Sequence, residues 1–212
     1  MGGILKSTWE MLHDGRFLKK ALMIACPVAL QGMLNTIVNM VDTLMIGGLG
    51  STAIAAVGLA NKVFFVFSLL VFGIVSGGGI LAAQFWGSGD VKNIRKVLGL
   101  CVMLAMVGAM FFVVPALTAP RMVMRIFTTS EGSIELGAKY LRIAALSYPF
   151  IALTNVYVAM LRATNKVVFP VICSCIAIVV NICLNYVLIF GKFGAPTMGV
   201  AGAACATLTA RC

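Results

Sequence analysis

The chain has 212 residues, of which 61% are hydrophobic and only 10% are charged, and its formal net charge is +10 at pH 7. Soluble domains carry about 25% charged residues, so this chain has too few charges to cover a water-facing surface, which excludes a soluble enzyme or a soluble nucleic-acid-binding domain. The composition predicts an all-α polytopic membrane protein.

Five apolar runs are long enough to cross a bilayer, which takes about 20 mostly apolar residues in a helix. A segment over residues 1–18, predicted to lie in the cytoplasm or at the membrane surface, precedes them. The predicted helices cover about residues 19–46, 53–84, 94–117, 134–160 and 168–190. A sixth apolar run, residues 199–212, is too short to span, which predicts a sequence that is cut off within its sixth helix.

Lysine and arginine residues are distributed unevenly between the two ends of these helices. Nine lie before the first helix, after the second or after the fourth: Lys6, Arg16, Lys19, Lys20, Lys92, Arg95, Lys96, Arg162 and Lys166. The other side holds Arg121, Arg125, Lys139 and Lys192, with Glu131 and Glu135 near the first three. Because positive residues favour the cytoplasmic side, the pattern predicts a cytoplasmic N-terminus. The basic excess is then explained by topology and by attraction to anionic headgroups.

Residues typical of catalysis or of bound metals are not arranged for either role. His13 is the only histidine, and it precedes the first helix. The seven cysteines are an odd number, and Cys173 and Cys175 point in different directions on a helix. No glycine-rich loop is followed by the Lys-Ser/Thr pair that holds phosphates. The sequence therefore predicts neither an enzyme nor a protein with a cofactor or a resident metal.

Polar residues follow one face of the first predicted helix. Gln31, Asn35, Asn39 and Asp42 recur at spacings of four, four and three residues, which places them on the same side. Such a stripe does not face lipid. Two interpretations remain open: a seam of interhelical hydrogen bonds with Asp42 near the headgroups, or a wet cavity whose one carboxylate exchanges a proton, a Na⁺ or a cationic ligand. Pro27, four residues before Gln31, predicts a kink in this helix.

Two further polar stripes are predicted to meet the first one in a cavity. In the fifth helix, spacings of seven and four join Ser174, Asn181 and Asn185. In the fourth helix, spacings of seven join Tyr140, Ser147 and Thr154, with Asn155 and Tyr157 nearby. These stripes carry one acid, Asp42, and no base.

Two features of the second helix lie outside this predicted cavity. Asn61 and Lys62 are expected to reach the outer membrane interface. Glycines gather further along, at Gly73, Gly77, Gly78 and Gly79. They indicate either close helix packing or a flexible segment.

Four stretches together resemble the multidrug and toxic compound extrusion (MATE) family of cation-coupled antiporters. They are ALMIACPVALQGMLNTIVNMVDTLMIGGLG, AAQFWGSGDVKNIRKVLG, MLRATNKVVFPV and NICLNYVLIFGKFGAPTMGVAGAACAT. They fall in the first helix, the loop after the second, the loop after the fourth, and the fifth helix into the sixth. The resemblance covers essentially the whole chain.

The resemblance implies two lobes of six helices, of which residues 19–212 match the first. It also implies an acidic residue near the outer end of the first helix, matching Asp42, and a proline bend, matching Pro27. Family members often carry Asn and Asp four residues apart in the fifth helix; Asn181 matches the first and Asn185 stands in place of the second. Asp42 is then the only residue of this lobe that matches one of the family's two first-lobe carboxylates. A cavity asparagine of the fourth helix matches Asn155.

The function implied by the resemblance is secondary-active efflux of cationic drugs or metabolites across the cell membrane in exchange for H⁺ or Na⁺. Asp42 would bind the coupling ion, and a C-terminal lobe missing from this sequence would complete the transporter. Two alternatives remain: a lipid-linked saccharide flippase of the same wider superfamily, which predicts basic residues in the cavity, and an inactive or structural membrane fragment.

Overall fold

A computed structural model of the chain describes residues 15–48, 50–190 and 198–211. Every regular element in that part is a helix, which confirms the all-α fold class. The helices are α2 (Gly15–Gly47), α3 (Ser51–Gly87), α4 (Val91–Thr118), α5 (Pro120–Arg125), α6 (Glu131–Ala145), α7 (Tyr148–Ala163), α8 (Val168–Phe190) and α9 (Val200–Arg211).

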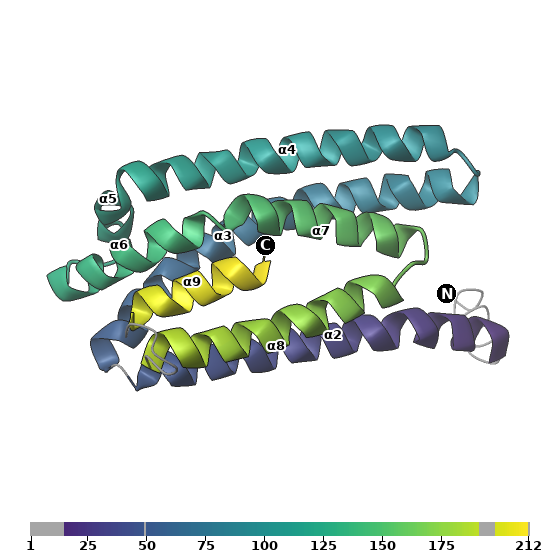
Figure 1. Ribbon diagram of the computed structural model, residues 1–212. Helices are drawn as coiled ribbons and strands as arrows, with labels where there is room; N and C mark the ends of the chain where they lie inside the picture. Colours follow the sequence, from purple (N-terminus) through teal and green to yellow (C-terminus); the bar gives the residue numbers. More distant parts are fainter. Residues whose placement is uncertain (1–14, 49, 191–197, 212) are drawn as a thin grey trace, which may run out of the picture.

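The long helices lie roughly along one axis (Figure 1). Helices α2 and α8 run side by side in the same direction, while α3, α4 and α7 pack together and α9 lies against α6 and α8. We call the end with the start of α2 and the α3–α4 and α7–α8 turns the proximal end. The opposite end, with the α2–α3 and α5–α6 turns, is the distal end.

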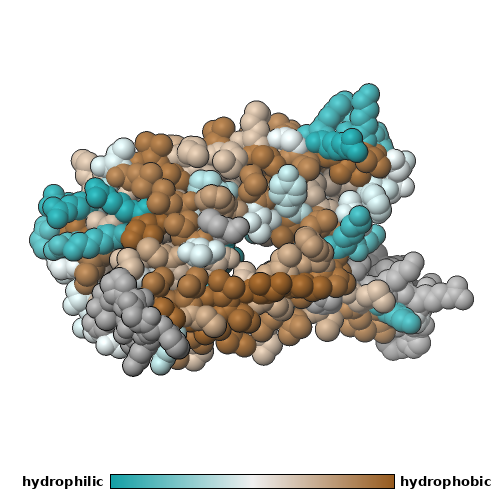
Figure 2. Space-filling model, in the orientation of Figure 1, coloured by the Kyte–Doolittle hydropathy of each residue, from teal (hydrophilic) through white to brown (hydrophobic). Residues whose placement is uncertain are grey.

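The outer surface of the bundle is suited to lipid rather than to water. Three helices are long and apolar enough to cross a membrane, namely Ser51–Gly87, Val91–Thr118 and Val168–Ile189, and α6 with α7 makes a fourth if the bent pair is one span. Large apolar side chains stand outward on them, such as Phe72 at 69% and Phe111 at 74% exposure. Apolar atoms cover the middle of the molecule in Figure 2, and hydrophilic atoms gather toward its ends. An apolar surface of this extent is typical of a membrane protein.

Aromatic rings and small residues fill the core between α3, α4 and α7. Phe67 is fully buried; its ring stacks on Tyr148 at 4.7 Å between centroids and meets Phe112 edge-on at 5.8 Å. Further along α3, Gly78 lies so close to α4 that a Cβ there would come within 2.2 Å of Cys101 Sγ. Among the four glycines predicted to allow close packing, Gly78 alone has neighbours within 4 Å of such a Cβ.

The predicted helix over residues 134–160 is two helices in the structure, which corrects the sequence interpretation. Helices α6 and α7 are bent by 47° relative to each other. The cause is Pro149, the second residue of α7, because its ring removes the N–H that would bond to the Ala145 carbonyl and crowds that oxygen. The chain turns there through hydrogen bonds from Leu146 N–H to the Ile143 carbonyl and from Ser147 N–H to the Ala144 carbonyl.

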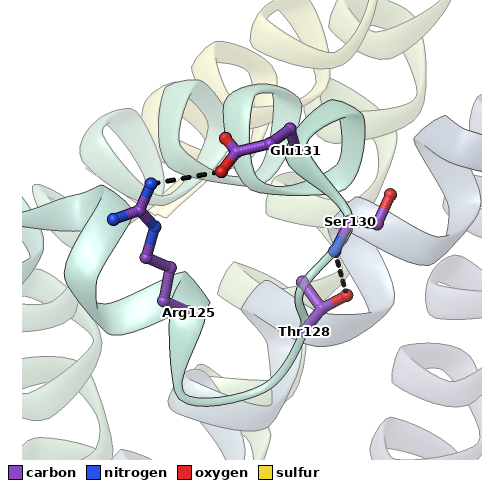
Figure 3. A network of polar contacts seen from close by, with 4 residues as sticks. All are labelled: Arg125, Thr128, Ser130 and Glu131. Carbon is purple, nitrogen blue, oxygen red and sulfur yellow. Dashed lines mark hydrogen bonds and ion pairs between the residues drawn. The ribbon is translucent and has the colours of Figure 1, made fainter.

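The short helix α5 is fixed against α6 at the distal end. Met124 is fully buried, and its methyl group occupies the place that a Cβ at Gly137 would take. Figure 3 shows the turn between the two helices: Arg125 Nη2 lies 3.1 Å from Glu131 Oε1, and the Ser130 N–H donates to Thr128 Oγ1 at 3.2 Å.

Candidate functional site

Gln31 joins three helices inside the bundle. Its side chain is 8% exposed; its Oε1 accepts a hydrogen bond from Arg162 Nη2 at 2.6 Å, and its Nε2 donates to Ser174 Oγ at 2.5 Å. Because a guanidinium donor makes a stronger hydrogen bond than a neutral one, the Arg162 contact is the stronger of the two. Helix α2 is thus connected to the end of α7 and to the first half of α8 by one amide group.

Asn181 and Asn185 form a second buried polar pair, about two and three turns beyond Ser174 on α8. They are 7% and 0% exposed, and Asn185 Nδ2 donates to Asn181 Oδ1 at 3.2 Å. Helix α8 packs against α2 and α9. The polar face predicted for the fifth helix therefore points into the bundle, with Ser174 half-buried at its proximal end.

The rest of the predicted α2 stripe is described only by its backbone. Asn35, Asn39 and Asp42 belong to α2, as does Pro27, but their side chains lie outside the described part of the structure. Their roles stay predictions from the sequence.

A cavity of about 340 Å³ lies toward the distal half, between the end of α2, the first half of α3, the α6–α7 break and α9. Its volume falls in the range that holds drug-sized ligands. Its walls combine aromatic rings, hydroxyl groups and one amide: they are formed by Thr43, Ile46, Val57, Asn61, Phe64, Phe65, Ser68, Tyr140, Ala144, Ser147, Tyr148, Ile151, Ala203, Thr207 and Arg211.

The predicted stripe of the fourth helix divides at the break between α6 and α7. Tyr140 and the buried Ser147 line the cavity. Thr154, Asn155 and Tyr157 are exposed on α7 and do not contribute to the lining of this cavity. The 47° bend after Ala145 changes the direction of the helix, so a seven-residue spacing no longer keeps one face.

Asn61, which was expected to reach the membrane interface, is exposed and also lines the cavity. Ser68 follows it by seven residues and lines the same cavity, a spacing that the sequence offered as a signal. Thr207 and Arg211, four residues apart on α9, also line the cavity. The sequence did not predict this, because their apolar run is too short to span a bilayer.

Two arginines lie beside the predicted polar residues or in the cavity lining, which the three polar stripes did not predict. The stripes contain no base, but Arg162 bonds to Gln31 and Arg211 lines the cavity. Acidic and metal-binding groups are sparse by contrast: within residues 15–48, 50–190 and 198–211, no three His, Cys, Asp or Glu residues lie together as a metal site would require.

Known proteins similar to this chain share its helical lobe. The MatE family model matches residues 27–187. The chain is 33% identical over 195 residues to a probable multidrug resistance protein NorM of Thermotoga maritima, covering 91% of this chain and 42% of that protein. It is 32% identical over 191 residues to the probable multidrug resistance protein YoeA of Bacillus subtilis, covering 86% and 40%. The chain thus spans less than half the length of these relatives.

Solved structures show the same fold. A MOP superfamily transporter from Pyrococcus furiosus superposes with a TM-score of 0.82 at 24% identity, over 91% of this chain and 42% of that one. A multidrug resistance MATE transporter in an inward-facing conformation gives 0.74 at 26% identity, over 83% and 39%. The family model, the relatives and the fold agree, and the chain belongs to the MatE family of multidrug and toxic compound extrusion transporters.

Proposed function

We propose that this chain acts as the first lobe of a secondary-active multidrug antiporter, which exports organic cations in exchange for H⁺ or Na⁺. The relatives that are named multidrug resistance proteins support the substrate class. A second lobe would close the other side of the substrate path, as expected for transporters in which two halves rock against each other around a central site.

The observation that carries the proposal is the set of buried amides in an apolar membrane bundle. Gln31, Asn181 and Asn185 are each at most 8% exposed among helices of high hydropathy. Burying polar groups costs free energy, and polar groups within membrane spans mark substrate or ion pathways. Their presence between α2 and α8 supports a transport role for this part of the lobe.

The nearby cavity offers a flat organic cation an aromatic wall, whereas the guanidinium of Arg211 disfavours a cation at the α9 wall. Phe64, Phe65 and Tyr148 present aromatic surfaces around it, and aromatic faces attract cations. The hydroxyl groups of Ser68 and Ser147 supply hydrogen-bonding groups without adding charge.

Asp42 is proposed as the group that couples ion and substrate. By sequence spacing it lies three helical turns beyond Gln31 on the same stripe, with Asn35 and Asn39 between them. A carboxylate there would hold the organic cation in one state and H⁺ or Na⁺ in the other, and a bend of α2 at Pro27 would accompany the exchange. Asn155 is proposed as a further polar contact for the substrate. The N-terminus is proposed to face the cytoplasm of a cell membrane.

Ethidium transport into inverted vesicles tests this function. The chain is produced with the C-terminal half of the Thermotoga maritima relative, and proton and Na⁺ gradients are imposed separately. We expect transport driven by one of the gradients, lost in Asp42→Asn. The matched control is Asp90→Asn, because Asp90 caps α4 at the proximal turn by accepting the Asn93 N–H at 3.1 Å and does not line this cavity. Gradient-driven transport that persists in Asp42→Asn would overturn the assignment.

A further inference from the structure

A second cavity, of about 380 Å³, opens at the distal end between α4, α5 and α6. We call it the distal groove; it is lined by Thr118, Ala119, Pro120, Arg121, Glu135, Ala138, Lys139 and Arg142. It shares no lining residue with the 340 Å³ cavity described above, and the proposed efflux mechanism does not use it.

The distal groove carries an excess of positive charge. Glu135, Lys139 and Arg142 follow one face of α6, and Arg121 of α5 borders the same groove. The single acid is neutralised within the groove, because Glu135 Oε1 lies 3.2 Å from Lys139 Nζ. Neither Arg121 nor Arg142 takes part in an ion pair within the described part of the chain. Two guanidinium groups are thus available to bind an anion.

Packing holds the two sides of the distal groove in place. Met124 of α5 is fully buried against Gly137 of α6, so the two helices approach closely. The Arg125–Glu131 ion pair joins the end of α5 to the start of α6 (Figure 3). The Met124 contact holds the α5 backbone against α6, whereas the ion pair is exposed on both sides, at 63% and 76%, and contributes little to this packing.

Exposed apolar side chains continue from the distal groove toward the middle of the membrane span. On α4, helical spacing back from Thr118 leads to Val114, Phe111 and Val107, which are 55%, 74% and 65% exposed. On the other wall, Leu146 follows Arg142 by four residues, before the bend, and is 44% exposed. Figure 2 shows hydrophilic atoms at the distal end bordering apolar surface. A charged groove beside an apolar stripe on α4 suits a phospholipid, whose charged headgroup adjoins its acyl chains.

We propose that the distal groove binds the phosphate of an anionic phospholipid, in the leaflet that meets the distal end. Arg121 and Arg142 hold the phosphate oxygens, because the planar guanidinium group pairs with phosphate through two parallel hydrogen bonds. The acyl chains lie along the exposed stripe of α4. A free phosphate ion shares the headgroup chemistry but makes no use of this apolar stripe, so the lipid is the better fit.

Native mass spectrometry of the purified 212-residue chain tests this assignment. The chain is mixed with phosphatidylglycerol and phosphatidylcholine in equal amounts, and the ratio of the two bound lipids is measured. We compare the unmodified chain with Arg121→Gln, Arg142→Gln and Arg125→Gln. The last is the matched control, because it removes the same charge from α5 but from a residue that pairs with Glu131 and does not line the groove. Melting temperatures without lipid identify any variant that has lost its fold.

We expect the unmodified chain and Arg125→Gln to retain phosphatidylglycerol in preference to phosphatidylcholine. Arg121→Gln and Arg142→Gln should each weaken that preference about fivefold, which corresponds to roughly 1 kcal/mol per basic residue at a membrane surface. An equal preference in all four proteins would refute the site. Displacement of phosphatidylglycerol by millimolar inorganic phosphate would refute the lipid as its occupant.

Discussion

Gly78 provides the sharpest test of the packing between α3 and α4. An alanine at this position would place its Cβ 2.2 Å from Cys101 Sγ and 3.3 Å from Met160 Cε. All three residues are buried, so the added methyl group enters a packed core. Adding a methyl group to a packed core costs about 1–3 kcal/mol. Gly77→Ala is the matched control, since a Cβ at Gly77 has nothing within 4 Å.

The two variants isolate the cost of the clash. Both gain the same helix preference of alanine over glycine, roughly 0.5–1 kcal/mol, so their difference in the free energy of unfolding is the clash alone, about 1–3 kcal/mol. For a chain of this size that corresponds to a melting temperature about 2–12 °C lower for Gly78→Ala than for Gly77→Ala.

Thermal unfolding in detergent, followed by size-exclusion chromatography, measures the difference. Adding Cys101→Ala removes the sulfur that the new methyl group meets. Gly78→Ala should therefore lower the melting temperature less in the Cys101→Ala background than in the unmodified chain. Equal melting temperatures for Gly77→Ala and Gly78→Ala would refute the close approach of α3 to α4.

Three further predictions concern contacts made within the lobe. Gln31→Leu leaves the half-buried guanidinium of Arg162 without its amide acceptor, so we expect a loss of about 1–3 kcal/mol, measured by SDS titration; an unchanged midpoint would contradict the contact. Gly202→Ala places a Cβ 2.6 Å from the backbone oxygen of Leu188, so α9 should separate from α8, and limited proteolysis should cut α9 faster than in the unmodified chain. Pro149→Ala restores a backbone donor, so the 47° bend between α6 and α7 should decrease, as measured by the distance between spin labels on the two helices; an unchanged distance would show that packing rather than proline sets the bend.

The fold class followed from the sequence because the membrane demands long apolar helices with their backbone groups satisfied internally. The helix predicted over residues 134–160 is interrupted just before Pro149. A hydropathy pattern does not reveal this break, because the apolar residues continue across the interrupted hydrogen-bond ladder. Short apolar runs are also hard to interpret: Thr207 and Arg211 of α9 line the cavity, although their run is too short to span a bilayer.

The polar face of the fifth helix could be predicted because Ser174, Asn181 and Asn185 keep helical spacing on an unbroken helix. The partner of Gln31 could not, because Arg162 lies 131 residues away at the end of another helix. Asn61, with Lys62, was predicted to reach the outer membrane interface, and its place in the cavity lining was not predicted. Its position in the cavity depends on how α3 packs against α6 and α7, which no local pattern contains.

The most direct test of the account is the competition between an organic cation and the coupling ion for this lobe. Ethidium fluorescence reports binding to the 212-residue chain in nanodiscs, titrated across a range of pH with and without Na⁺, in the unmodified chain, Asp42→Asn and Asp90→Asn. We expect acidification or Na⁺ to displace ethidium from the unmodified chain and from Asp90→Asn, whereas Asp42→Asn should bind it weakly and respond to neither ion. Ethidium binding by Asp42→Asn with the affinity and ion dependence of the unmodified chain would contradict it.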